Sequence, residues 1–167
     1  EATNIVPAYC EAQFGIRAAT RKGLEEVKEK VYTAVKHSAA AVGVKCEIEE
    51  GLIYADRNDN LTMASFMKQN LESLGLDVKE PPKRGGIASS DIGNVSQIVP
   101  TLQSYIKIGE AANHTIEFTK EAASEGGMVG LNQAAKAMAM TAVDLLFNPK
   151  NLQKVKEEFD NWKKEQE

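Results

Sequence analysis

The chain has 167 residues, enough for one ordinary domain or two small ones with a modest core. Its apolar content of 43% and charged content of 26% are typical of a soluble globular protein. The formal charge of −4, with lysines spread among glutamates, argues against binding to nucleic acid, which favours a clustered basic face. The sequence contains no run of about twenty apolar residues, so it predicts no membrane-spanning helix and no membrane partner.

The first third of the chain predicts a strand, a helix and a second strand. Residues 8–18 alternate between apolar and polar side chains, which is typical of a half-buried strand. Thr20 is a good N-cap for the helix that follows, and Gly43 ends it. Residues 45–49 alternate again. A strand-helix-strand unit is half of a split β-α-β sandwich, although two strands alone make a marginal sheet.

The two cysteines fall on the apolar faces of these predicted strands. Paired strands could bring Cys10 and Cys46 close enough for a disulfide. Buried free thiols are the preferred interpretation. Free thiols favour a reducing compartment, so we expect a cytoplasmic location.

A polar run over residues 55–60 marks a boundary, which divides the chain into regions 1–57 and 58–167. Asn58 or Asp59 can cap a helix over residues 61–74 that Gly75 ends. Val78 begins a short strand, which the prolines at 81 and 82 terminate.

The next stretch is the best candidate for a site wall. Gly85 and Gly86 can let the backbone approach a ligand, and Asp91 is expected to cap a short helical turn over residues 92–97. Residues 102–108 alternate and predict a strand, and His114 follows just past its end. The alternative is an ordinary Gly-rich loop followed by a surface histidine.

Two longer helices close the chain. Thr115 is a candidate cap for a short helix over residues 116–123, and the glycines at 126 and 127 are expected to break it. Residues 131–147 predict the strongest helix, with these positions inward: Leu131, Ala135, Met138, Ala142, Leu145 and Leu146. Asn148 and Pro149 open a last helix with one apolar side: Leu152, Val155, Phe159 and Trp162.

Several motifs occur in an order that resembles one family. SSDIGNVS over residues 89–96, IVP over 98–100, HT at 114–115, EF at 117–118 and AA at 122–123 resemble the C-terminal signature of metallopeptidase family twenty. The similar branch holds p-aminobenzoyl-glutamate hydrolases and related N-acyl-amino-acid amidohydrolases. NIVP over residues 4–7 and YCEAQFGIRAAT over 9–20 resemble the second half of that family's lid domain. One departure is Ile92, where the branch commonly has Met.

The resemblance implies an α/β fold, in which a partial ferredoxin-like lid precedes the C-terminal part of a metallohydrolase catalytic domain. It implies that the chain begins inside the lid, after the family's other metal ligands and general base. The parent enzyme would use two divalent ions (Zn, alternatively Mn or Co) to hydrolyse the amide of N-acyl amino acids or aminobenzoyl-glutamate-like substrates. This chain alone would be inactive and would bind no ion tightly, and homo-oligomers would form through the lid.

The resemblance also assigns roles to single residues. His114 matches the family's late histidine ligand. Asn4 matches the lid asparagine that polarises the scissile carbonyl, commonly in the other subunit's site. Arg17 matches the arginine that receives the substrate carboxylate, and Gly85 and Gly86 line the substrate side. The alternatives are a turn residue before a proline for Asn4 and a solvated charge for Arg17.

Other polar residues receive no catalytic role. Glu117, Glu121 and Glu125 are expected to form a solvated helical face, and His37 is expected to lie at the surface. The alternative function is a non-catalytic binding or oligomerisation module, because half of a lid would leave a strand edge that recruits partners.

Overall fold

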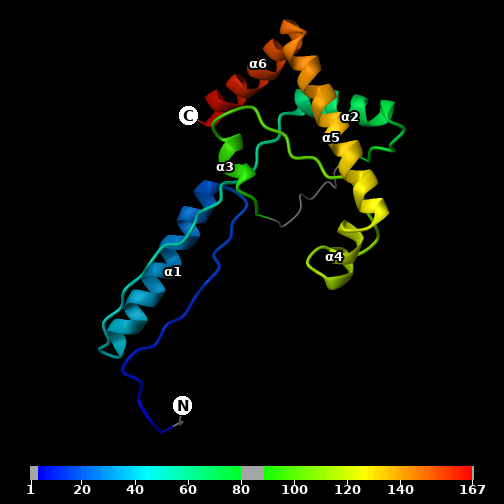
Figure 1. Ribbon diagram of the computed structural model, residues 1–167. Helices are drawn as coiled ribbons and strands as arrows, with labels where there is room; N and C mark the ends of the chain where they lie inside the picture. Colours follow the sequence, from blue (N-terminus) through cyan, green and yellow to red (C-terminus); the bar gives the residue numbers. More distant parts are fainter. Residues whose placement is uncertain (1–3, 80–88, 167) are drawn as a thin grey trace. The chain divides into compact units, whose positions relative to one another are not determined.

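The computed structural model describes residues 4–79 and 89–166, and the chain divides into two compact units, Glu1–Asp56 and Arg57–Glu167. The secondary structure of the described residues consists of helices (Figure 1): α1 Arg21–Ala41, α2 Leu61–Ser73, α3 Ile92–Ser96, α4 Ile116–Ala122, α5 Glu125–Leu146 and α6 Pro149–Gln166. None of the helices in this part of the chain has the length and apolar character needed to cross a membrane.

The predicted α/β fold is wrong for the described residues. Within residues 4–79 and 89–166 there is no sheet, and the strand-like pairing is an isolated parallel bridge between Asp59 and Thr101. The strands predicted over residues 8–18, 45–49 and 102–108, and from Val78, are not formed. The alternation is present in the sequence, but a strand also needs a neighbour to pair its N–H and C=O groups, and a two-stranded unit supplies too little pairing.

The helix predicted in unit 1 is confirmed. Thr20 Oγ1 accepts a hydrogen bond from Gly23 N at 3.1 Å, and Gly43, with a φ of 72°, follows the end of α1. A left-handed φ carries no Cβ penalty in glycine, which is why the helix can stop here.

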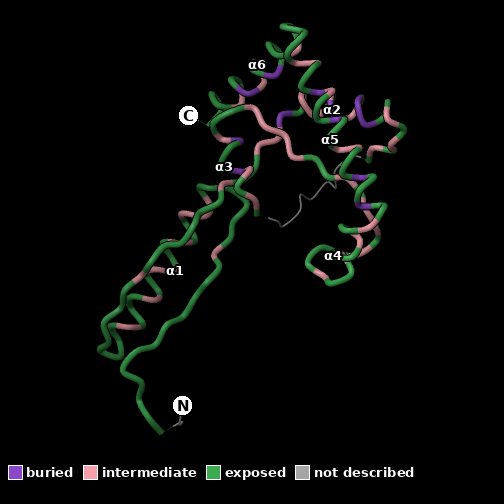
Figure 2. The backbone as a smooth tube through the Cα atoms, viewed as in Figure 1, coloured by how far each residue is buried: buried purple, intermediate pink, exposed green. Residues whose placement is uncertain are grey.

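The segment after α1 returns along the same helix (Figure 1). Glu50 Oε2 lies 3.4 Å from Lys28 Nζ, and Asp56 Oδ1 accepts from Arg21 N at 3.0 Å. These polar contacts hold the middle and the end of the extended segment against α1. No residue described in unit 1 is buried (Figure 2).

The cysteines are free thiols, as predicted, but their predicted burial is wrong. Cys10 and Cys46 are both exposed. Both were expected to be buried on the apolar face of a sheet, and that sheet is not formed among the described residues.

The core of unit 2 is built from α2, α5 and α6. Met67 and Leu71 of α2 pack with Ala137 of α5. Partly buried residues surround this cluster: Leu74, Leu76, Val78, Leu102 and Ile106. On α6, the predicted apolar side is confirmed for Val155 and Phe159, which are buried, and for Trp162, whose ring lies 5.7 Å from that of Phe159. Leu152, the fourth predicted position, is exposed.

The inward face predicted for α5 is largely wrong. Leu131, Met138 and Leu146 are 61%, 63% and 76% exposed, Ala135 and Ala142 are exposed, and Leu145 is partly buried. The buried face consists of small residues: Gly127, Gly130, Ala137 and Thr141. A Cβ at Gly130 would lie 2.8 Å from Ile108 Cγ2, so small size lets the neighbouring segment come close. Because α5 is apolar around its circumference, periodicity does not identify one buried stripe.

The two glycines after α4 do not break a helix; they begin the next one. Ser124 Oγ accepts from Gly127 N at 3.2 Å and caps α5. A Cβ at Gly127 would lie 2.5 Å from the carbonyl oxygen of Ala122. Glycine at this place therefore lets the end of α4 pack directly on the start of α5.

The caps of α2 and α3 differ from the predicted ones. Asn60, the residue after the two predicted caps, is the N-cap of α2, and its Oδ1 accepts from Met63 N at 2.9 Å. Asp91 makes no side-chain cap bond to α3. Ser90 Oγ instead accepts from Ile92 N at 3.2 Å, so the neighbouring hydroxyl replaces the carboxylate.

A second cap of α2 comes from α6. Glu158 accepts hydrogen bonds from Leu61 N at 2.6 Å and from Thr62 N at 2.8 Å, one with each carboxylate oxygen. The first N–H groups of a helix have no partner within the helix, and a negative charge there is favourable. Glu158 therefore joins α6 to the start of α2.

Glu158→Ala should lower the free energy of unfolding of the chain by about 2–3 kcal/mol, because two hydrogen bonds to a charged acceptor are lost. The neighbouring Glu157→Ala, which removes only the 2.7 Å bond from Gln153 Nε2, should change it by less than about 0.5 kcal/mol. Urea unfolding followed by circular dichroism measures both. Equal effects of the two changes would contradict the cap.

Candidate functional site

His114 lies in the turn that precedes α4 and has an unusual backbone conformation. Its φ is 66°, and it is the non-glycine residue with positive φ in the described part of the chain. For a residue with a Cβ this region costs about 1–2 kcal/mol. Surrounding contacts must therefore hold the turn, and the histidine side chain itself remains exposed.

Thr115 closes the turn from the C-terminal side. Its Oγ1 donates to the carbonyl oxygen of Ala112 at 2.7 Å and accepts from Phe118 N at 3.1 Å. The second bond is the predicted N-cap of α4, which is confirmed. The same hydroxyl thus fixes both the turn around His114 and the first turn of the helix.

Glu121 closes the turn from the N-terminal side. Its two carboxylate oxygens accept from Glu110 N at 3.1 Å and from Ala111 N at 2.9 Å. A Cβ at Gly109 would overlap this carboxylate, so the contact depends on glycine. The expectation that Glu121 is simply solvated is wrong, and no local sequence pattern connects it to a loop ten residues earlier.

An open depression of about 760 Å³ surrounds His114. Its lining combines polar tips with an apolar surface: Tyr105, Asn113, His114, Thr115, Ile116, Phe118 and Thr119. The imidazole therefore stands where a small ligand can reach it, beside a phenol and two hydroxyls.

Arg57 holds Tyr105 at the edge of this depression. Arg57 Nη1 donates to Tyr105 Oη at 3.3 Å and to Gln103 Oε1 at 2.9 Å, and Nε donates to Asp59 Oδ2 at 2.8 Å. Burial disfavours its charge, but the hydrogen bond to Tyr105 and the charge of Asp59 raise the pKa of Arg57 above its ordinary value. Sequence reasoning placed Arg57 at a domain boundary and missed its contact with Tyr105, because the two residues are forty-eight positions apart in the sequence.

The other predicted site residues are spread over the chain. Asn4 lies in an exposed turn, and Arg17 lies on the exposed extended segment of unit 1 that precedes α1. Gly85 and Gly86 lie outside the described residues. His37 is exposed, as predicted, with Nδ1 2.7 Å from the carbonyl oxygen of Thr33.

A metal ion would find one suitable donor in the His114 depression. The exposed imidazole is a good ligand for a first-row divalent cation, while zinc sites in proteins use three or four protein ligands. Across residues 4–79 and 89–166, no group of three or more His, Cys, Asp or Glu side chains is placed to hold an ion. The described residues therefore do not by themselves form a metal site, and His114 is the single candidate ligand in this depression.

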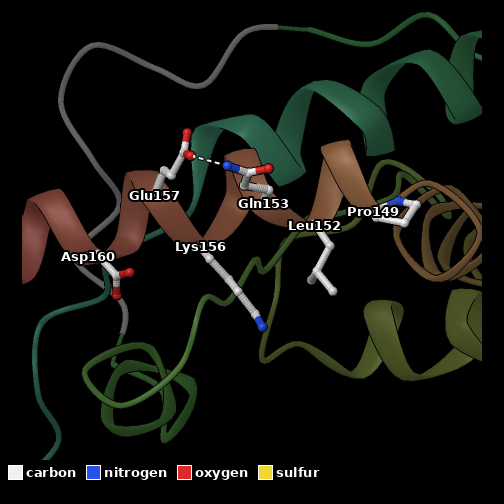
Figure 3. A pocket seen from close by; sticks show the side chains of 6 residues that line it. All are labelled: Pro149, Leu152, Gln153, Lys156, Glu157 and Asp160. Atoms are coloured by element: carbon white, nitrogen blue, oxygen red, sulfur yellow. Dashed lines mark hydrogen bonds between the residues drawn. The ribbon is translucent and has the colours of Figure 1, made fainter.

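A second, smaller depression of about 380 Å³ runs along α6 (Figure 3). All its lining residues belong to this helix: Pro149, Leu152, Gln153, Lys156, Glu157 and Asp160. The dashed line in Figure 3 joins Gln153 Nε2 to Glu157 Oε1, while Lys156 points away from this pair. Since no second element supplies a converging group, we do not regard this depression as a functional site.

No protein-family model matches the chain. Two dipeptidases are similar to it. The Xaa-Arg dipeptidase of Mus musculus is 35% identical over 160 residues, which cover 93% of this chain and 37% of that protein. The Xaa-Arg dipeptidase of Homo sapiens is 33% identical with the same coverage. The chain therefore spans little more than a third of the length of these relatives.

The similarity includes the two main candidate residues. The unmatched part of the chain is about a dozen residues, so Arg17 and His114 lie inside the matched region wherever it begins. The names of both relatives agree with the peptidase resemblance that the sequence motifs indicate.

The conformation of His114 predicts which substitutions the turn accepts. His114→Asn should change the free energy of unfolding by less than about 0.5 kcal/mol, because asparagine tolerates a left-handed backbone. His114→Val should lower it by about 1–2 kcal/mol, because a β-branched residue does not. Chemical unfolding of both variants measures this, and an equally stable valine variant would contradict the assigned conformation.

Proposed function

We propose that this chain contributes to a metal-dependent peptidase or amidohydrolase that cleaves the amide bond of a small substrate. The observation that carries the proposal is the similarity to two Xaa-Arg dipeptidases over 93% of the chain. The exposed imidazole of His114 in an open depression supports it. Since the chain spans 37% of the relatives' length, we attribute the activity to the whole protein and expect this chain alone to be inactive.

The substrate class that we propose is a dipeptide, preferably with a C-terminal arginine, in line with the relatives' names. N-acyl amino acids and aminobenzoyl-glutamate-like compounds are the alternatives. All three carry a free carboxylate next to the scissile amide. Arg17 would bind that carboxylate through two parallel N–H donors, a geometry that a guanidinium provides and an ammonium does not.

The remaining roles follow from the chemistry of each side chain. His114 would be one ligand of a pair of divalent ions, Zn or alternatively Mn or Co, which when bound supply the Lewis acid that polarises the amide. Asn4 would donate its side-chain N–H to the developing oxyanion, in the site of a second subunit. Tyr105, oriented by Arg57, would offer its hydroxyl to the substrate beside His114.

The role of Arg17 can be tested in the full-length protein with a dipeptide and its C-terminal amide. Arg17→Ala should lower kcat/KM for the dipeptide by roughly thirty- to a thousandfold, equivalent to about 2–4 kcal/mol for a lost charge-assisted pair. The amide should be almost unaffected, because no anion remains to be bound. Lys22→Ala, an exposed cation on the first turn of α1, is the matched control and should change neither constant.

Two results separate the roles of Arg17 and His114. His114→Asn should reduce kcat/KM for both substrates alike, because the metal serves the amide chemistry that they share. Equal loss of acid and amide in Arg17→Ala would make Arg17 a structural charge. Full activity of His114→Asn on both substrates would refute the ligand role and the metal-dependent function with it.

A second candidate function is assembly through unit 1. Its extended segments expose large apolar side chains: Tyr9, Phe14, Val44 and Leu52. These segments form no sheet within the described residues, and exposed apolar side chains gathered on extended segments favour association with a partner. A cytoplasmic location, suggested by the free thiols of Cys10 and Cys46, is part of the same proposal.

We expect a dimer or larger species of this chain at tens of micromolar in sedimentation velocity. Phe14→Lys should shift the population toward monomer, because a charge on the exposed apolar side opposes pairing. Lys36→Ala, at an exposed position of α1 outside the extended segments, is a control that should leave association unchanged. A monomer for the unmodified chain would contradict the assembly function and leave the peptidase proposal untouched.

A further inference from the structure

We propose that the exposed apolar side of α5 is an interaction surface, and that it packs against the part of the full-length protein that lies outside this chain. Six residues spaced three or four positions apart share this side of the helix: Met128, Leu131, Ala135, Met138, Ala142 and Leu146. They are the outer face of α5. The inference depends neither on the proposed peptidase activity nor on a bound ion.

The first step is the exposure of the outer face. Leu131 and Leu146 are 61% and 76% exposed, and the other four members are exposed as well. Helix α2 covers a different side of α5, where Asn70 Nδ2 donates to Thr141 Oγ1 at 3.1 Å and Ala137 is buried in the core. Buried and exposed positions therefore follow one another along α5 (Figure 2), and the outer face has little cover from the described residues.

The second step is the composition of the helix. Three of the 22 residues of α5 are charged: Glu125, Lys136 and Asp144. Glu125 belongs to the first turn, and Asp144 accepts from Asn70 of α2 at 2.8 Å. Lys136 lies about 100° around the helix from Ala135, away from the centre of the outer face. A helix that is apolar around its circumference is typical of a buried helix, so the outer face is suited to a partner surface rather than to water.

The third step is the size of the outer face, which decides between two occupants. The helix rises about 27 Å from Met128 to Leu146 and is about 10 Å wide with its side chains, so the face offers roughly 270 Å². A stable dimer buries about 800 Å² on each partner. A second copy held by this face alone would therefore bind weakly. Packing within one polypeptide needs less area, because the two surfaces are already linked and lose less translational and rotational freedom.

The fourth step is the length of the relatives. The similarity covers 93% of this chain but 37% of the dipeptidase of Mus musculus, so most of that protein has no counterpart in this chain. Apolar side chains of a domain usually form one contiguous core. The outer face of α5 therefore completes a core whose other side belongs to the remaining part of the full-length protein.

One substitution made in two proteins tests this surface. Leu131→Lys places a charge on the outer face. Val129→Lys is the matched control, because Val129 is 51% exposed and lies about 160° around the same helix from Leu131. Both substitutions are made in this chain and in the full-length protein, and circular dichroism measures the midpoint of thermal unfolding.

In this chain, both lysine substitutions should shift the midpoint by less than about 2 °C, because both positions are exposed. In the full-length protein, Leu131→Lys should lower the midpoint by about 5 °C or more, because the packed face would then bury an unpaired charge. Val129→Lys should again have little effect. Equal effects of Leu131→Lys in the two proteins, or of both substitutions in the full-length protein, would overturn the inference.

Thiol labelling gives an answer even if Leu131→Lys prevents the full-length protein from folding. Ala135→Cys is a small change on the outer face, and Val129→Cys is its control. Peptide mass spectrometry follows the introduced thiol separately from the exposed Cys10 and Cys46. The thiol introduced by Ala135→Cys should react at least about tenfold more slowly in the full-length protein than in this chain, whereas that of Val129→Cys should react at similar rates in both.

Three results would overturn the inference. Fast labelling of Ala135→Cys in the full-length protein would show that the outer face stays open. Slow labelling already in this chain would show that the chain covers the face itself. Loss of self-association of this chain on Leu131→Lys, measured by sedimentation velocity, would assign the face to a second copy.

Discussion

Asn60 is the side chain on which the arrangement of unit 2 most depends. It is 3% exposed, and its Oδ1 caps α2 while its Nδ2 donates to the carbonyl oxygen of Val155 at 3.0 Å. Its backbone N–H donates to Thr101 O at 2.8 Å. One residue thus joins α2, α6 and the segment that leads to His114. Few apolar side chains are buried, so these polar contacts fix which helix ends meet. Removing this amide would remove the cap of α2 and the bond to α6 together.

The helices were predictable wherever the signal was local. Thr20, Thr115 and the Asn148–Pro149 pair act on N–H groups within a few residues, so the sequence alone identifies them. The strands were not predictable, because alternation describes one segment and a sheet requires a second. The cap of α2 also escaped prediction by one or two positions, since the contact with α6 favours Asn60 over Asn58 and Asp59.

The candidate site shows the same division. His114 was found through its flanking motif, and its place just after an extended segment agrees with the sequence. Glu121 and Arg57 were missed because the groups that they hydrogen-bond belong to residues ten and forty-eight positions away in the sequence. Small residues on α5 were misread for a similar reason, since Gly130 is buried only because Ile108 packs against it. A residue that belongs to a family motif can be recognised in the sequence. A residue that acts by holding its neighbours is recognised only from contacts in the folded chain.

The exposed extended segments of unit 1 determine where proteases should cut the chain first. A protease binds its target in extended form, so a helix must unfold locally before it can be cut. The segments on either side of α1 are already extended and exposed, whereas α5 and α6 pack against the core. Nicking should therefore begin in unit 1 and stop near Arg57, and the surviving piece would retain His114 and Glu121 but not Arg17.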